Sequence, residues 1–152
     1  MTISNKAVGN EAMKIAETFE LQEGRATKRV DRDGVGYDLH AIDIQGERFI
    51  EVKGFAESWA THDWQSLYQS QVKLLKAYPE KFFLYMVHFD KENFPNTYQL
   101  FAISGAQLLS DGFRLEPESF RLSPISQRKL KPYAVSVEKS VVENRRKVLQ
   151  HD

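Results

Sequence analysis

Residues 36–55, GYDLHAIDIQGERFIEVKGF, contain the pattern that decides the fold. Apolar residues precede and follow Gln45-Gly46-Glu47, which has the composition of a turn, and this order predicts two antiparallel strands joined as a hairpin. Asp38 stands at the start of the first strand. Glu51 and Lys53 end the second strand and, because they are two residues apart, project from the same face. We therefore expect two carboxylates and one ammonium group to meet at one end of this hairpin.

Length and composition indicate what kind of protein carries this hairpin. The chain has 152 residues, of which 41% are hydrophobic, as is usual for one domain with a single core. It contains no cysteine, which excludes a disulfide framework and a thiolate metal site. No apolar run approaches the roughly 18 residues of a membrane helix, and the first residues do not have the pattern of an export signal. We expect a cytoplasmic protein that has no membrane partner.

The net charge is zero, with 21 basic and 21 acidic residues. This balance counts against a protein that holds nucleic acid by bulk electrostatics alone, because neutralisation of phosphates supplies non-specific affinity. Basic residues do cluster at 25–29, 127–131 and 145–147. Each cluster is compatible with an ordinary solvated face and with a nucleic-acid contact.

The remaining pattern predicts an α/β fold of one domain. The expected order is αβββαβ, with a mixed central sheet of four to five strands flanked by helices over residues 1–104. Residues 105–152 form a C-terminal extension packed on the same domain. The expected helices are 5–23, 64–78, 104–109 and 138–149. The expected strands besides the hairpin are 25–30 at an edge, 81–89 at the centre, 98–103, and 133–137 at the other edge.

The hairpin cluster can be interpreted from its charges. Two neighbouring carboxylates repel each other unless a cation lies between them, and Mg²⁺ or Mn²⁺ binds through such oxygen ligands. Asp38 and Glu51 fit this role, with the backbone carbonyl of Val52 as a third oxygen. Lys53 could then orient or deprotonate an attacking water. The alternative is structural, with Asp38 as a turn residue and Glu51 and Lys53 as an exposed ion pair.

Asp38 followed by Glu51-Val52-Lys53 resembles the catalytic core of the PD-(D/E)xK nuclease superfamily. More narrowly, residues 36–38, 50–54 and 83–87 are similar to the NO VEIN C-terminal-like branch, which is often attached to helicases and restriction systems. The match spans residues 9–89. Branch members usually carry a glutamate where Gln71 aligns.

This resemblance implies that residues 1–104 form a restriction-endonuclease-like core. It also implies a metal-dependent deoxyribonuclease that acts in restriction, defence or DNA processing. Asp38, Glu51 and Val52 would bind Mg²⁺ or Mn²⁺, and Lys53 would position the water. Glu11 would add an outer-sphere contact, and Gln71 would steer Lys53. DNA is the expected partner, with a homodimer and a helicase or restriction-system protein as further partners. The alternative function is a non-catalytic module that retains the nuclease fold and binds nucleic acid or protein.

Several other side chains are candidates for contact with nucleic acid. The four histidines lack the spacing of a zinc site, but His40 shares a strand face with Asp38. Trp59 and Trp64 follow the hairpin, where they could stack on an unpaired base or close over the core. The candidates for nucleic-acid binding are Arg25, Lys28, Arg29, His40, Trp59 and Trp64.

Overall fold

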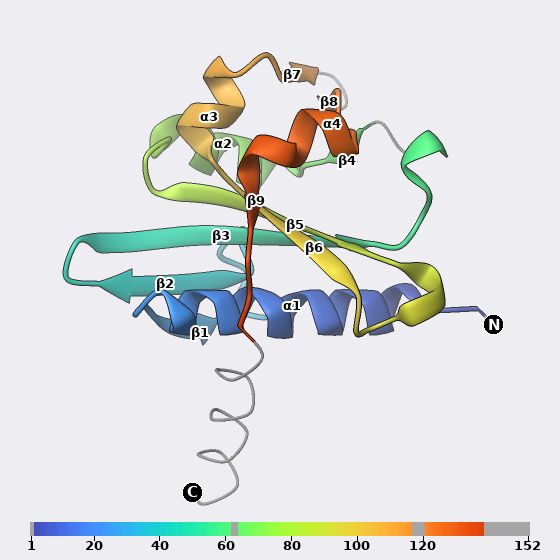
Figure 1. Ribbon diagram of the computed structural model, residues 1–152. Coiled ribbons are helices and arrows are strands. Elements are labelled where there is room, and N and C mark those ends of the chain that lie inside the picture. Colours follow the sequence, from blue (N-terminus) through green and yellow to red (C-terminus); the bar gives the residue numbers. More distant parts are fainter. Residues whose placement is uncertain (1, 62–63, 117–120, 139–152) are drawn as a thin grey trace, which may run out of the picture.

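In the computed structural model, which describes residues 2–61, 64–116 and 121–138, the chain begins with a long helix, α1 (Asn5–Gln22) (Figure 1). The Ser4 hydroxyl caps the helix by accepting a hydrogen bond from the Ala7 amide at 3.1 Å. Gly24, with φ of 81°, follows its end. The apolar stripe that predicted this helix is its buried face, so the prediction is confirmed.

Six strands form the main sheet, in the order β1-β2-β3-β5-β6-β9. Only β3 and β5 pair in parallel, with α2 (Gln69–Ala77) in the segment between them, and the other neighbours are antiparallel. The strands are β1 (Ala26–Arg29), β2 (Leu39–Asp43), β3 (Gly46–Phe55), β5 (Phe82–Phe89), β6 (Tyr98–Ser104) and β9 (Ala134–Val135). The α/β class and the mixed sheet are confirmed. The prediction of four to five strands is wrong, because both short edge strands join the sheet.

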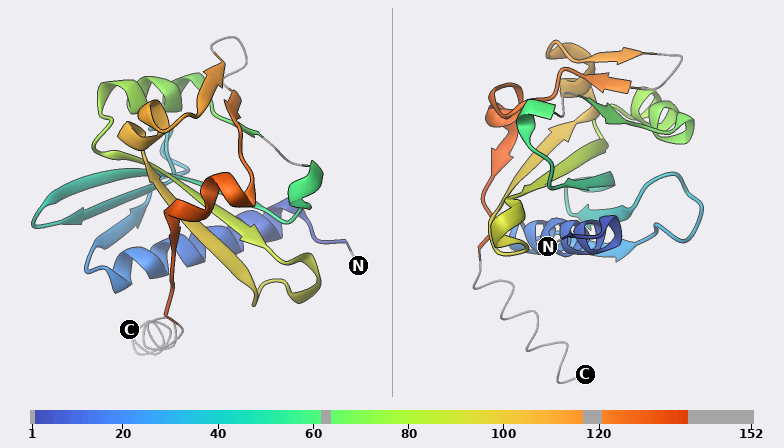
Figure 2. Two further views of the ribbon diagram at one scale, coloured as in Figure 1. Left: turned by 45° about the horizontal axis from the view of Figure 1, so that its top comes forward. Right: turned by 90° about the vertical axis from the view of Figure 1, so that its right-hand side faces the viewer.

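The sheet lies between two layers, as the side view in Figure 2 shows. On one face, α1 packs against Leu39, Ile50, Tyr85 and Val87. On the other face, Leu84 and Met86 pack with α2 and α3 (Gly105–Ser110) and with residues from the C-terminal part of the chain. Because β5 is covered on both faces, its nearly continuous apolar sequence is explained.

A second sheet of three short strands covers part of the second face, in the order β4-β8-β7. Its strands are β4 (Gln65–Ser66), β8 (Arg121–Ser123) and β7 (Arg114–Glu116). The helix predicted over 64–78 therefore begins only at Gln69. The physical reason is that Gln65 and Ser66 pair with residues far along the chain, Leu122 and Arg121, which local periodicity cannot reveal.

Short helical turns complete the described structure. They are η1 (Trp59–Thr61), η2 (Lys91–Asn93), α4 (Gln127–Leu130) and η3 (Lys131–Tyr133). Ser104 caps α3 as predicted, because its hydroxyl accepts from the Gln107 amide at 3.1 Å. The helix predicted over 138–149 lies outside the described residues except for Glu138. Within the described ranges, no helix is both long enough and apolar enough to cross a membrane.

Candidate active site

The end of the β2–β3 hairpin brings Glu51 and Lys53 together as the sequence predicts. The Lys53 Nζ lies 2.9 Å from Glu51 Oε2. Both side chains project from the sheet face opposite α1, because the intervening Val52 packs in the cluster on the α1 side. This pair is not the exposed ion pair of the structural alternative, since Glu51 is only 4% exposed.

Asp38 is fixed at the same end of the hairpin by two hydrogen bonds to β3. Its amide donates to the Ile50 carbonyl at 2.9 Å, and its carboxylate Oδ2 accepts from the Val52 amide at 2.8 Å. The N–H and C=O groups of one strand residue point to the same side. The Val52 carbonyl therefore points toward the side on which Asp38 lies, as a third oxygen of the site requires.

Glu51 is in an unusual electrostatic state. Its Oε1 atom is buried and has no hydrogen-bond partner among the described residues. Burial raises the pKa of Glu51, Lys53 lowers it and the nearby Asp38 raises it, and the net pKa is about 8. At neutral pH this carboxyl group is therefore mostly protonated, although a cation beside it would favour the ionised form.

The start of α2 closes over this end of the hairpin. Gly36 has φ of 89°, and a Cβ atom at this position would lie 3.2 Å from the Ser70 Cβ, so the loop before Asp38 contacts α2 closely. Gln71 is buried, and its Oε1 accepts from the Tyr68 amide at 2.9 Å. The Tyr68 ring in turn lies 5.4 Å from Lys53 Nζ. Gln71 thus fixes Tyr68, and Tyr68 is a residue of the site that the sequence analysis did not identify.

Glu11 lies on α1, which covers the sheet face opposite the one that carries Glu51 and Lys53. The structure gives it Lys14 as a partner, with 3.2 Å between the charged atoms. Its role as an outer-sphere ligand therefore stays a prediction that the geometry does not favour.

The basic and histidine candidates for nucleic-acid contact are mostly engaged within the domain. The Arg25 guanidinium pairs with the buried carboxylate of Glu20, and Arg29 pairs with Glu17. His40 Nε2 lies 2.9 Å from Glu47 Oε2 on the neighbouring strand β3. Lys28 is exposed on β1.

The two tryptophans have different surroundings. Trp59 packs on Phe55, His88 and Phe101, with ring centroids 4.4 to 6.0 Å apart, and closes over the core. The prediction that it could stack on a base is therefore not favoured. Trp64 is 37% exposed, and the guanidinium carbon of Arg121 lies 4.8 Å from the centre of its ring.

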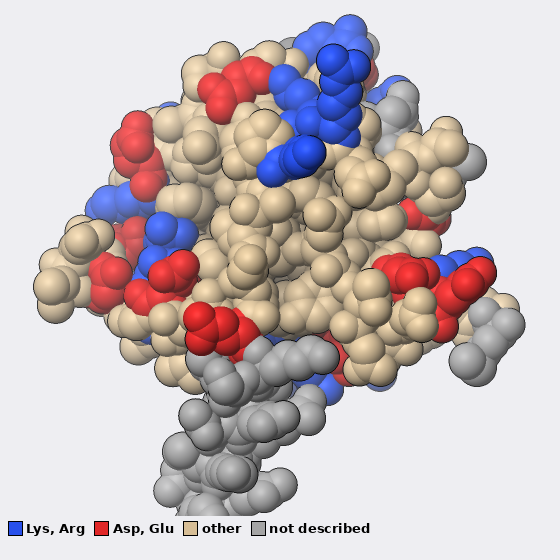
Figure 3. Space-filling model, in the orientation of Figure 1, with Lys and Arg blue, Asp and Glu red and all other residues tan. Residues whose placement is uncertain are grey.

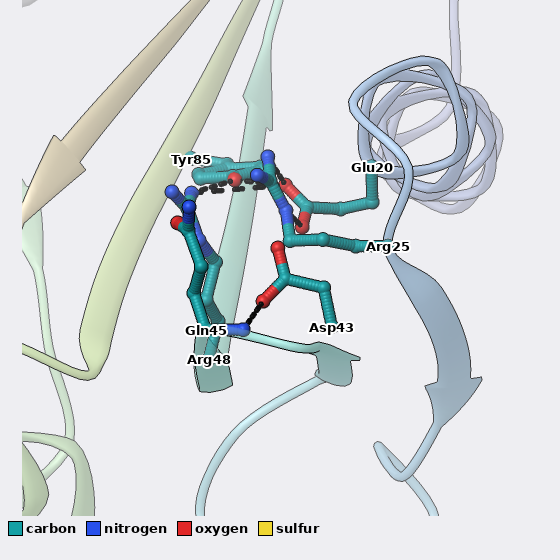
Figure 4. Close-up of polar contacts among 6 residues, drawn as sticks. All are labelled: Glu20, Arg25, Asp43, Gln45, Arg48 and Tyr85. Atoms are coloured by element: carbon teal, nitrogen blue, oxygen red, sulfur yellow. Dashed lines mark hydrogen bonds and ion pairs between the residues drawn. The ribbon is translucent and has the colours of Figure 1, made fainter.

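A second buried carboxylate, Glu20 at the end of α1, lies on the other side of the sheet (Figure 4). It accepts hydrogen bonds from the Arg25 guanidinium and from the Tyr85 hydroxyl. Arg48 donates to that hydroxyl at 2.9 Å, and burial together with Glu20 raises the pKa of Tyr85. This cluster could not be predicted from the sequence, because Glu20 falls on the apolar stripe of a helix and belongs to no motif.

The residues at the hairpin end fit a hard divalent cation in their donor chemistry. They offer two carboxylates and one backbone carbonyl, which suit Mg²⁺ or Mn²⁺ when water and substrate phosphate complete the coordination. The described part of the chain contains no group of three or more histidine and acidic side chains arranged to hold a metal. The unpaired Glu51 Oε1 is the atom that a cation would satisfy.

This α/β domain, which carries Asp38, Glu51 and Lys53 at one end of its β2–β3 hairpin, belongs to a defined family. The family model described as protein NO VEIN, C-terminal, matches residues 8–103, and the chain is therefore a member of that family. A search of curated proteins finds no match to the chain. The matched region contains the β2–β3 hairpin, α2 and the central strand β5.

Proposed function

We propose that this protein is a metal-dependent nuclease that hydrolyses phosphodiester bonds in DNA. The observation that carries the proposal is the Glu51 carboxyl group, which is buried beside Asp38 and Lys53 with one oxygen unpartnered among the described residues. An unpaired buried carboxyl oxygen costs free energy in a structure that gains nothing from it. Such a cost is common where a group must meet a ligand.

The chain's own residues would divide the work as follows. Asp38, Glu51 and the Val52 carbonyl would hold Mg²⁺ or Mn²⁺, which supplies Lewis-acid stabilisation of charge on the phosphate and lowers the pKa of bound water. Lys53, held against Glu51, would position the attacking water and neutralise charge that develops on the phosphoryl oxygens. Gln71 would act indirectly, through Tyr68, on the surroundings of Lys53.

The element order also supports a restriction-endonuclease-like core of the PD-(D/E)xK type. One helix precedes three strands, and α2 then leads to a strand that pairs in parallel with β3. In this arrangement an acid opens one strand of a hairpin and the Glu-x-Lys element closes the next, as Asp38, Glu51 and Lys53 do. A role in restriction, defence or DNA processing, and assembly as a homodimer or with a helicase or restriction protein, belong to the same proposal.

Cleavage of plasmid and oligonucleotide DNA in the presence of Mg²⁺ or Mn²⁺ tests this function. Asp38→Ala and Lys53→Ala should each lower the cleavage rate by about a hundredfold or more, because each removes a group that acts on the reacting phosphate. Asp43→Ala and Lys81→Ala are matched controls. Asp43 lies beside the turn, at the opposite end of the hairpin from Glu51 and Lys53, and Lys81 pairs with Glu47. All four variants should retain the circular dichroism spectrum of the wild type.

Equal cleavage by the wild type and both site variants would contradict the proposal. DNA binding that does not depend on metal, without any cleavage, would instead identify the alternative, a binding module that retains the fold.

A further inference from the structure

Tyr68 is exposed beside Lys53 of the proposed active site. It is the N-cap residue of α2 and is 72% exposed, although its backbone amide is fixed by the buried Gln71. Its ring lies 5.4 Å from Lys53 Nζ. An exposed aromatic ring, on a backbone that Gln71 fixes, is therefore presented to solvent beside the lysine assigned to the attacking water.

Trp64 directly precedes β4, and Arg121 lies on β8. The Arg121 guanidinium lies over the Trp64 ring, and the antiparallel pairing of Ser66 with Arg121 fixes β4 against β8. Tyr68 follows β4 by two residues, and both aromatic side chains are exposed. Figure 3 shows that Lys and Arg side chains gather over the part of the molecule formed by β7, β8 and α4. The basic residues in and directly after these elements are Arg114, Arg121, Arg128, Lys129 and Lys131.

We propose that Tyr68 stacks on an unpaired base next to the scissile phosphate, and that Arg121, held on Trp64, contacts the backbone of the same strand. The inference rests on the proposed nuclease function and assigns its substrate class, which is single-stranded or locally unpaired nucleic acid. The chemistry fits because base stacking on an aromatic ring is tolerant of sequence and needs a base whose face is open. A paired base is stacked between its neighbours and does not offer that face.

The contrast with Trp59 supports the assignment to Tyr68. Trp59 is packed on the rings of Phe55, Phe101 and the half-buried His88, whereas Tyr68 has the much larger exposed fraction and the cation beside it. A single exposed aromatic residue is ordinary on a protein surface. Its anchoring by Gln71 and its place beside Lys53 distinguish Tyr68 from such a residue.

Fluorescence anisotropy with a labelled single-stranded oligonucleotide of about 16 nucleotides, and with the duplex of the same sequence, tests the inference. EDTA in the buffer prevents cleavage. The wild type should bind the single strand about tenfold more tightly than the duplex. Tyr68→Ala should lose about tenfold in affinity for the single strand, whereas Tyr68→Phe, which keeps the ring, should retain it. Tyr78→Ala is the matched control, because Tyr78 is an exposed tyrosine at the other end of α2.

Unchanged single-strand affinity in Tyr68→Ala, or an equal loss for single strand and duplex, would overturn the inference. The cleavage assay separates this failure from failure of the nuclease proposal. If cleavage requires Asp38 and Lys53 while Tyr68→Ala binds the single strand like the wild type, only the stacking role is wrong. If cleavage is absent but the single-strand preference depends on the Tyr68 ring, the stacking role is supported and the nuclease function is not.

Discussion

Glu20 and Glu51 are both buried carboxyl groups, but they lie on opposite faces of the same sheet and have opposite surroundings. Glu20 receives hydrogen bonds from Arg25 and Tyr85, with Arg48 nearby, so its charge is compensated. Glu51 has one lysine, a second carboxylate beside it and an unpartnered oxygen among the described residues. The difference teaches that burial alone does not mark a functional acid. In the proposed function, the incompletely compensated acid is the one assigned to the metal.

The largest expected effect on stability comes from removing the compensated acid. Glu20→Ala leaves the Arg25 guanidinium buried without its partner and removes the acceptor of the Tyr85 hydroxyl, at a cost of about 3–5 kcal/mol in the free energy of unfolding. Urea denaturation of the wild type and the variant measures this cost. Glu17→Ala, on the same helix and paired with the more exposed Arg29, is the matched control and should lose about 1 kcal/mol or less. A loss at Glu20 no greater than the loss at Glu17 would show that the cluster is not compensated as described.

Replacement of Glu51, the incompletely compensated acid, should stabilise the folded protein instead of destabilising it. The size of this effect should depend on pH. The pKa of Glu51 is about 8 in the folded protein, against 4.5 for an ordinary glutamate, so the folded state binds a proton that the unfolded state releases in this window. The contribution of Glu51 to the free energy of unfolding is fully present below pH 4.5 and is lost as pH rises toward 8. The loss amounts to at most about 5 kcal/mol. Glu51→Gln cannot ionise. In the absence of metal it should therefore become more stable than the wild type as pH rises, and the two should converge near pH 4.

Thermal unfolding across this pH range, in buffer with EDTA, measures the difference. Glu47→Gln changes a more exposed acid on the same strand, whose pKa is lowered by His40, and its profile above pH 5 should run parallel to that of the wild type. A constant difference between Glu51→Gln and the wild type from pH 5 to 9 would show that Glu51 is ionised throughout.

A smaller effect is expected where α1 meets β3, at the glycine that follows Lys53. A Cβ atom on Gly54 would lie 2.9 Å from the Ala12 Cβ, so Gly54→Ala should cost about 1–3 kcal/mol by overpacking. Gly9 lies on α1, the helix that carries Ala12, and an added Cβ there would have nothing near it. Gly9→Ala should therefore stabilise the protein by up to about 1 kcal/mol. Denaturation midpoints compare the two. Equal effects of the two substitutions would contradict the close contact between helix and strand beside the site.

The hairpin was predictable because its information is local. Alternating apolar residues and the turn around Gly46 determine the pairing, and the spacing of Glu51 and Lys53 then fixes their common face. The central strand 82–89 was recognisable for a similar reason, since only a strand covered on both faces is apolar throughout.

Other features depend on contacts that the sequence pattern does not encode. The start of α2 is delayed because Gln65 and Ser66 pair with β8, and this pairing also determines where Tyr68 lies. Trp59 and Trp64 look alike in the sequence, but Trp59 packs on the rings of Phe55 and Phe101, whereas Trp64 lies against the Arg121 guanidinium and is 37% exposed. The compensation of Glu20 by Arg25 and Tyr85 joins a helix, a strand and the segment between α1 and β1.

Titration calorimetry with Mn²⁺ tests most directly the central claim that the incompletely compensated acid is a metal ligand. At pH 8 the wild type should bind one Mn²⁺ per chain and release protons on binding, because Glu51 must ionise to become a ligand. Binding should be lost in Asp38→Asn and in Glu51→Gln, and it should persist in Asp43→Asn, which alters an acid of the same hairpin outside the site. Binding isotherms that are identical in the wild type, Asp38→Asn and Glu51→Gln would contradict the claim.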